Sequence, residues 1–118
     1  MKLSEEKVRA LIQQGENDSV EFKVSLPDAS ALAQNISALA NTHGGTLFVG
    51  IEESGKIAGT SPEQIIQLVE KAKELLTPTL DLDVSTLVID HKPVVMISVP
   101  KAQQVVFSFS TGHFYNSF

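Results

Sequence analysis

The hydrophobic periodicity of this chain changes twice within its first fifty residues, and this limits the folds that the chain can adopt. Apolar and polar residues alternate over 20–26, which predicts a half-buried strand. A helical spacing of apolar residues follows over 28–43 and ends at Gly44, and 46–51 is a short apolar run that predicts a strand buried on both faces. A chain that passes from strand to helix to strand packs its helices against a sheet.

The flanking segments extend the same pattern. A first helix is predicted to end at Gly15, and Ser61, which a proline follows, is a strong start for another helix that we expect to end at Thr77. The final third carries mainly strand signals, beginning with an alternation over 80–85. We therefore predict a single α+β domain in which a mixed, mostly antiparallel sheet is packed by about three helices.

The composition limits the class of protein. The chain has 118 residues, enough for one core, and no cysteine, which excludes disulfides, thiolate zinc sites and cysteine nucleophiles. No apolar run approaches the roughly 20 residues that span a bilayer, so we expect a cytoplasmic protein without a membrane partner. The net charge of −5 argues against strong non-specific binding of nucleic acid, because such binding brings Lys and Arg to phosphates. A nucleic-acid contact would therefore need a local basic patch, or help from another part of a longer protein.

Glu16, Glu21 and Lys23 form an acidic cluster with a nearby lysine, across a turn and the start of the first predicted strand. Convergent carboxylates are what Mg²⁺ or Mn²⁺ requires, and a lysine beside them could hold a phosphate. The alternative is a solvated strand edge whose charges keep the sheet from pairing with other chains. The residues alone favour the second interpretation, and both stay open.

Gly44 and Gly45 follow a predicted helix and therefore lie at the negative end of its dipole. This position favours a helix C-cap and a close approach of backbone over a phosphate cradle. Asn41, Thr42 and His43, just before the glycines, could line a site, although a capping role is favoured for them as well.

Residues 50–56 have the G-x-x-x-x-G-K spacing of a phosphate-binding loop, but three features argue against that function. Ile57 stands where Ser or Thr would hold Mg²⁺, Glu52 and Glu53 would repel a triphosphate, and no helix begins before Ser61. We therefore expect a hairpin here, and ATP binding is the least favoured function.

Three segments together resemble the Schlafen/AlbA-type DNA-binding domain family, also known as the divergent AAA domain. They are Glu16 with 21–23, the segment 38–45 that ends in two glycines, and the segment 50–59. The resemblance covers residues 15–115. It implies a nucleic-acid-binding (DNA) regulatory domain of a bacterial transcriptional regulator, non-catalytic by itself, with 1–118 as the N-terminal domain of a longer protein.

The resemblance also implies roles for individual residues. In a nucleic-acid-binding module, the contacts would come from side chains in the three segments and in the first helix. These candidates are Lys23, Lys56, Asn41, Thr42, Lys7 and Arg9.

A metal-dependent endoribonuclease is a second function that the resemblance allows. Glu16 and Glu21 would then be catalytic metal ligands for Mg²⁺ or Mn²⁺, with Glu52 or Glu53 as the third carboxylate. A protein-interaction module that forms a homo-oligomer is the third. All three functions require the acidic turn, the helix end with its two glycines and the hairpin to form one surface.

Overall fold

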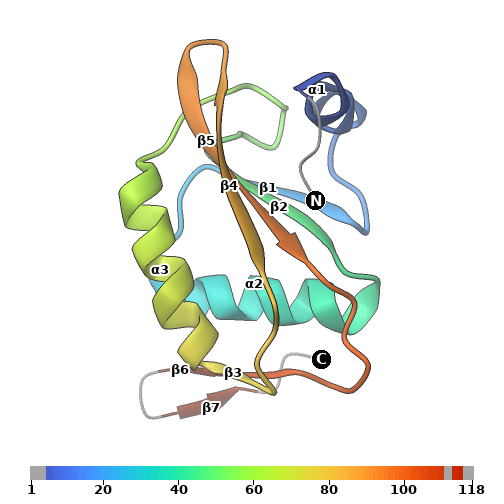
Figure 1. Cartoon of the computed structure of the whole chain (residues 1–118), viewed down its shortest axis with the longest axis vertical. Coiled ribbons are helices and arrows are strands. Elements are labelled where there is room, and N and C mark those ends of the chain that lie inside the picture. The colour runs from blue at the N-terminus through green and yellow to red at the C-terminus, as the bar shows by residue number, and fades with distance from the viewer. Residues whose placement is uncertain (1–4, 111–112, 116–118) are drawn as a thin grey trace.

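A computed structural model describes residues 5–110 and 113–115 of the chain (Figure 1). Its elements, in chain order, are α1 (Glu5–Gln14), β1 (Val20–Lys23), α2 (Ala29–Thr42), β2 (Gly45–Val49), α3 (Pro62–Glu74), β3 (Leu76–Thr77), β4 (Asp83–Ile89), β5 (Lys92–Val99), β6 (Phe107–Ser110) and β7 (His113–Tyr115). The predicted α+β class with three helices is confirmed. No helix in the described part of the chain is long and apolar enough to cross a membrane.

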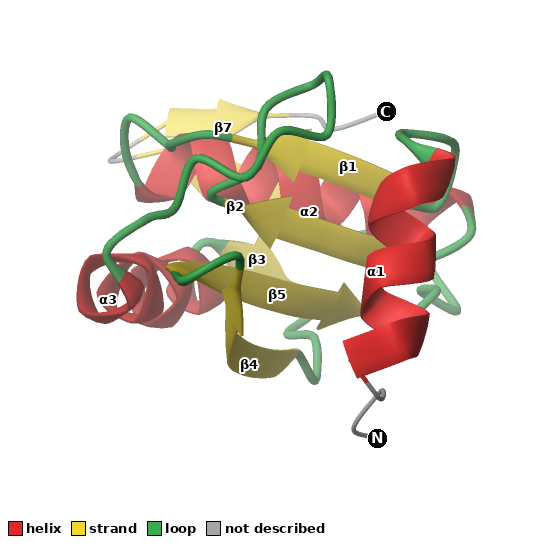
Figure 2. Cartoon of the chain, turned by 90° about the horizontal axis from the view of Figure 1, so that it is seen from above, coloured by secondary structure: helices red, strands yellow, loops and turns green. Residues whose placement is uncertain are grey.

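The central sheet has four strands in the order β1-β2-β5-β4 (Figure 2). β1 and β2 are parallel, and the chain crosses between them through α2. β5 is antiparallel to both of its neighbours, so this sheet is mixed and mostly antiparallel, as predicted. A second, antiparallel sheet of β3, β6 and β7 lies at the end of the molecule opposite the tip of the β4–β5 hairpin (Figure 1).

Helices pack on both faces of the central sheet. On one face α2 and α3 cover a core that includes Leu47 of β2 and Ile97 of β5, both fully buried. On the other face α1 contributes Val8 to a second core. In this second core the rings of Phe22 and Phe48 meet edge to face with 6.0 Å between their centroids. β2 therefore buries residues on both faces, which explains its continuous apolar run.

Capping bonds define the ends of the helices. At the start of α2, the Asp28 carboxylate accepts a hydrogen bond from the Ala31 N–H at 2.9 Å. At its end, the Gly44 N–H donates to the Leu39 carbonyl at 2.8 Å, which confirms the predicted C-cap. Ser61 stands at the N-cap position of α3, as predicted, but its hydroxyl makes no capping bond within the described chain.

Two predicted boundaries need correction at the ends of β1 and α3. The alternation over 20–26 extends beyond the strand, because β1 ends at Lys23 and Val24 is 46% exposed. Helix α3 ends at Glu74 instead of near Thr77, and the short strand β3 follows it to pair with β6.

The strand predicted over 80–85 also needs correction. β4 begins at Asp83 and continues to Ile89, because β5 pairs with this range. Leu80 and Leu82 still pack against the core beneath α2 and α3. The alternation over 80–85 therefore reflects which side chains are buried, although residues 80–82 do not pair with another strand of the described chain.

Candidate functional site

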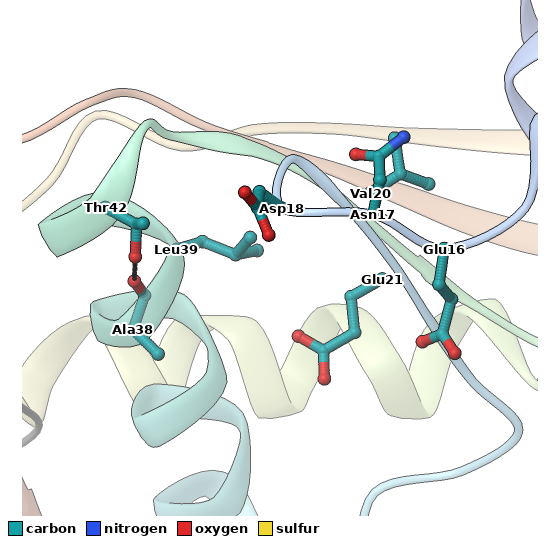
Figure 3. A pocket seen from close by; sticks show the side chains of 8 residues that line it. All are labelled: Glu16, Asn17, Asp18, Val20, Glu21, Ala38, Leu39 and Thr42. Carbon is teal, nitrogen blue, oxygen red and sulfur yellow. Dashed lines mark hydrogen bonds between the residues drawn. The ribbon is translucent and has the colours of Figure 1, made fainter.

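An open cleft of about 410 Å³ lies between the turn before β1 and the C-terminal half of α2 (Figure 3). One side of the cleft is acidic and the other is formed by the helix. The acidic side chains are Glu16, Asp18 and Glu21, and those of the helix are Ala38, Leu39 and Thr42. Two of the predicted acidic residues, Glu16 and Glu21, therefore share one cleft.

The turn before β1 is held by its own hydrogen bonds. Asn17 and Val20 exchange backbone hydrogen bonds of 3.0 and 3.3 Å, and the Ser19 N–H donates to Asn17 Oδ1 at 2.8 Å. Glu16 joins the turn to the strand six residues later in the sequence, because its Oε2 accepts a hydrogen bond from the Phe22 N–H at 3.0 Å. Since Phe22 belongs to β1, the Glu16 carboxylate occupies the outer edge of the sheet at this point.

Glu21 and Lys23 lie on the same side of β1, as the alternation predicts, and form an ion pair. Their carboxylate oxygen and ammonium nitrogen are 3.5 Å apart, and the side chains are 30% and 39% exposed. Water screens such a pair, so its contribution to stability is small, about 0–1 kcal/mol. The pair places the positive charge of Lys23 beside the acidic cleft.

The two glycines after α2 allow the helix end and the turn to lie close together. A Cβ on Gly45 would collide with the carbonyl oxygen of Ser19 and would lie 2.8 Å from its Cα. At Gly44, where φ is +72°, a Cβ would lie 2.6 Å from the backbone nitrogen of Lys101. The predicted close approach of backbone is confirmed, and it fixes one side of the cleft against the other.

Asn41 and Thr42, predicted as nucleic-acid contacts, are both bonded to backbone. Asn41 Nδ2 donates to the Val106 carbonyl at 2.9 Å, and its Oδ1 accepts from the Val106 N–H at 2.8 Å. The Thr42 hydroxyl donates to the Ala38 carbonyl at 2.6 Å (Figure 3). Val106 is fully buried, so a ligand that took over the Asn41 amide would leave two buried polar groups unpaired.

The loop between β2 and α3 forms the predicted hairpin. Ile51 and Ile57 form an antiparallel bridge, the Glu52 N–H donates to the Lys56 carbonyl at 2.9 Å, and the Gly55 N–H donates to the Glu52 carbonyl at 2.8 Å. These bonds occupy N–H groups that a phosphate-binding loop would offer to its ligand. The hairpin interpretation is confirmed.

Two lysine side chains lie at this loop. Lys56 lies within it and is exposed. The Lys92 ammonium donates to the Ile57 carbonyl at 3.3 Å. Lys23 is joined to the loop through its backbone carbonyl, which accepts from the Gly50 N–H at 2.7 Å, whereas its ammonium pairs with Glu21. We call Lys56 and Lys92 with residues 50–59 the lysine loop.

The other predicted basic contacts lie on α1. Lys7 and Arg9 are both exposed. The Arg9 guanidinium forms ion pairs with Glu5, at 3.3 Å, and with Asp90, at 3.5 Å. Its charge is therefore partly balanced by neighbouring carboxylates, which makes it a weaker candidate for a phosphate than Lys56.

The predicted metal ligands do not come together. Glu16 and Glu21 line the cleft beside the turn before β1, whereas Glu52 and Glu53 follow β2 and do not line that cleft. Within residues 5–110 and 113–115, no group of three or more Asp, Glu, His or Cys side chains could hold a metal ion. The residues present therefore do not fit a three-carboxylate centre. Of the three predicted segments, the turn and the helix end share the cleft, and the hairpin does not line it. The prediction that all three segments form one surface is therefore wrong, and the cleft and the hairpin are two separate candidate sites.

Comparison with known proteins identifies the family. A sequence profile of the Schlafen, AlbA_2 family matches residues 16–116, which is most of the chain. The chain belongs to this family. A search of curated proteins found no match.

Solved structures share the fold of this Schlafen, AlbA_2 domain. The crystal structure of the DIP2311 protein of Corynebacterium diphtheriae matches with a TM-score of 0.64 and 23% identity, over 87% of this chain. This chain spans only 23% of that protein. An NMR structure from Nitrosomonas europaea, the N-terminal domain of a RecG-related protein, matches with a TM-score of 0.64 and 15% identity, over 99% of this chain and 88% of that one.

Two features of this Schlafen, AlbA_2 domain were missed by sequence reasoning. One is the place of Lys92, whose ammonium contacts the Ile57 carbonyl 35 residues earlier in the sequence and so lies beside the residues 50–59 on which the family resemblance partly rests. The contact between Glu16 and Phe22 was also missed, and the six-residue spacing gives no signal for it, because it depends on the path of the turn.

Proposed function

We propose that this domain binds nucleic acid, with DNA as the first candidate, as a regulatory and non-catalytic module. Membership of the Schlafen, AlbA_2 family supports this proposal. The Nitrosomonas europaea neighbour is consistent with it, since its name relates the longer protein to an ATP-dependent DNA helicase. Because this chain spans a fraction of the Corynebacterium protein, we also propose that it acts as one part of a larger regulator.

The observation that carries the proposal is the lysine loop. Lys56 and Lys92 lie at a hairpin that is held by backbone hydrogen bonds, so their ammonium groups are presented from a fixed base. Glu52 and Glu53 lie in the same hairpin and oppose a phosphate, so the proposal depends on these two lysines as the local cations that a chain with a net charge of −5 needs in order to approach phosphates. Asn41 and Thr42 support binding less well, because their polar atoms are engaged with backbone.

The test is equilibrium binding of fluorescent single-stranded DNA, duplex DNA and RNA, measured by anisotropy over a range of salt concentrations. The double variant Lys56→Gln with Lys92→Gln should weaken binding and reduce the salt dependence by roughly two phosphate contacts, since each contact contributes about 0.9 to the log–log slope. Lys71→Gln with Lys73→Gln on α3 is the matched control, because it removes the same charge from a different surface.

Two results would contradict the proposal. One is binding by the wild-type chain that does not weaken as salt rises, because phosphate contacts release counterions and must be sensitive to salt. The other is an equal loss of affinity in both double variants, which would show that total charge matters and the lysine loop does not.

The endoribonuclease hypothesis retains one supporting observation, that Glu16 and Glu21 line the same cleft. It is the weaker candidate because the third carboxylate does not reach them. Incubating tRNA with Mn²⁺ and either the wild-type chain or the variant Glu21→Ala distinguishes the two functions. Cleavage by the wild type that the variant lacks would support the nuclease, and equal behaviour of the two would remove Glu21 from any catalytic role.

A further inference from the structure

The two outer strands of the central sheet are protected to different degrees. β1 has four residues, and its free edge is occupied by the turn at Asn17 and by the carboxylate of Glu16, which accepts from the Phe22 N–H. β4 has seven residues and pairs only with β5 in the described part of the chain (Figure 2). An unprotected edge strand presents N–H and C=O groups to any other strand.

β4 also lacks the residues that prevent strands from pairing. Its sequence, Asp83 to Ile89, contains no lysine, proline or glycine, and four of its seven residues are β-branched. Val88 is 66% exposed, more than any other large hydrophobic residue whose exposure is described. An open groove of about 230 Å³ lies beside the strand, between it and α1, and is lined by Val8 and residues 86–89.

We infer that β4 is an interface for a second copy of this chain, which pairs with it in antiparallel orientation across a twofold axis at Thr86. This axis pairs all seven residues of the strand, whereas any other position leaves residues at the ends unpaired. Val84 then lies opposite Val88 of the second copy on one face, and Ser85 lies opposite Leu87 on the other. Residues opposite each other in an antiparallel pair share a face, so the exposed Val88 becomes covered by Val84.

The charges at the ends of the strand agree with this pairing. Asp83 lies opposite Ile89 of the second copy, and Ile89 pairs with Lys92 within its own copy. Asp83 and Lys92 of different copies therefore occupy the same face, two strand spacings or about 10 Å apart. Twofold symmetry repeats this arrangement at the other end, so positions of opposite charge lie on the same face at both ends of the interface.

The pairing also removes the unprotected edge. Two four-stranded sheets would join into one sheet of eight, with β4 against β4 in the middle and β1 at both outer edges. Both of those edges carry the Glu16 contact that already blocks further addition of strands. The assembly is therefore closed at two copies, and it goes beyond the proposed nucleic-acid function.

Cross-linking tests the register of this interface, because the chain has no natural cysteine. In Thr86→Cys the new thiol faces its own copy across the axis, with Cβ atoms about 4.5–5.5 Å apart. A disulfide spans Cβ atoms up to about 4.5 Å apart, so a small local shift brings the thiols within reach and catalysed oxidation should give a covalent dimer. In Val88→Cys the two thiols would be about 13 Å apart and should not react. Failure of Thr86→Cys to cross-link, or equal cross-linking of both variants, would overturn the inference.

Sedimentation of the 118-residue chain tests the association itself. At roughly 100 µM we expect twice the chain mass of 12.7 kDa. Val88→Lys should raise the dimer dissociation constant about tenfold or more, because it places an unpaired charge against Val84 of the second copy. Val105→Lys, at a site 46% exposed and outside β4, is the matched control and should sediment as the wild type does. A monomeric wild type, or a dimer that Val88→Lys does not weaken, would refute the interface.

Discussion

Replacing Asn41 by alanine should destabilise the fold through the segment that leads into β6. The Asn41 amide is the partner of both the N–H and the carbonyl of Val106, at 2.8 and 2.9 Å. The Ala102 N–H donates to the Ala40 carbonyl at 2.8 Å, so the last turn of α2 holds this segment at two places. Asn41→Ala removes one of them and leaves both polar groups of Val106 without a partner.

The size of the effect follows from the burial of Val106, whose exposure is 0%. A buried donor or acceptor that loses its partner costs about 1–3 kcal/mol. Water that enters the space left by the amide would recover part of this cost, so we expect a loss of about 2–4 kcal/mol for the two groups together. This is a large fraction of the 5–15 kcal/mol that typically stabilises a domain.

Urea unfolding followed by circular dichroism measures this loss, and about 3 kcal/mol should lower the midpoint by roughly 2 M at an unchanged slope. Thr42→Ala is the matched control. Its hydroxyl bonds only to the Ala38 carbonyl of the same exposed helix end, and alanine favours the helix, so its stability should stay within about 0.5 kcal/mol of the wild type. If Asn41→Ala were as stable as Thr42→Ala, the contact between Asn41 and Val106 would not contribute to the stability of the fold. A loss of nucleic-acid affinity at full stability would instead restore Asn41 as a binding residue.

Three other predictions use matched pairs or a single addition. Gly45→Ala should lower the free energy of unfolding by about 3 kcal/mol or more, because its methyl group meets the Ser19 backbone. Gly15→Ala should lower it by about 1–2 kcal/mol, because φ is +82° there but nothing lies within 4 Å of the new Cβ. Equal urea midpoints for the two variants would contradict this. Asp28→Ala should lower the stability by about 1 kcal/mol because it removes the cap of α2, whereas Ser61→Ala should lower it by less than about 0.5 kcal/mol because Ser61 makes no capping bond within the described chain. Asp28→Ala should therefore have the lower unfolding temperature. Millimolar Mn²⁺ should leave the unfolding temperature unchanged, since three carboxylates do not meet in the described chain; a rise of several degrees would reveal a metal site.

The helices and the buried strands could be predicted because their signals are local. Helix α2 was predicted over 28–43 and spans Ala29–Thr42, since its apolar spacing and its C-terminal glycine both act within the helix. β4 was placed too early because alternation records which side chains are buried. Leu80 and Leu82 are directed to the core before the ladder begins, and the start of the ladder depends on β5, a strand later in the chain. A pairing partner cannot be read from the strand itself.

The candidate site shows the same division. The shared side of Glu21 and Lys23 follows from the period of one strand and was predicted. The partner of Asn41 lies 65 residues later, so the sequence could not show whether its amide faces a ligand or the backbone of Val106. The carboxylates failed to converge for a related reason, because a parallel pairing of β1 with β2 separates the turn from the hairpin by the length of the strands.

The lysine loop and the β4 interface can act together, and their combination gives the strictest test of both proposals. A twofold axis perpendicular to the sheet keeps both copies of Lys92 on the same face, with the two Ile89 positions that pair with them about 20 Å apart along β4. One duplex could then contact both lysine loops, doubling the phosphate contacts of a chain whose net charge otherwise opposes binding. The test compares the disulfide-linked Thr86→Cys dimer with the same protein after reduction and dilution to monomer. The two forms carry the same charges and differ only in whether two lysine loops are held together. On a duplex of roughly 20 base pairs the linked form should show about twice the salt slope of the reduced form. Equal slopes would mean that the two loops do not reach one duplex, even if each proposal holds alone.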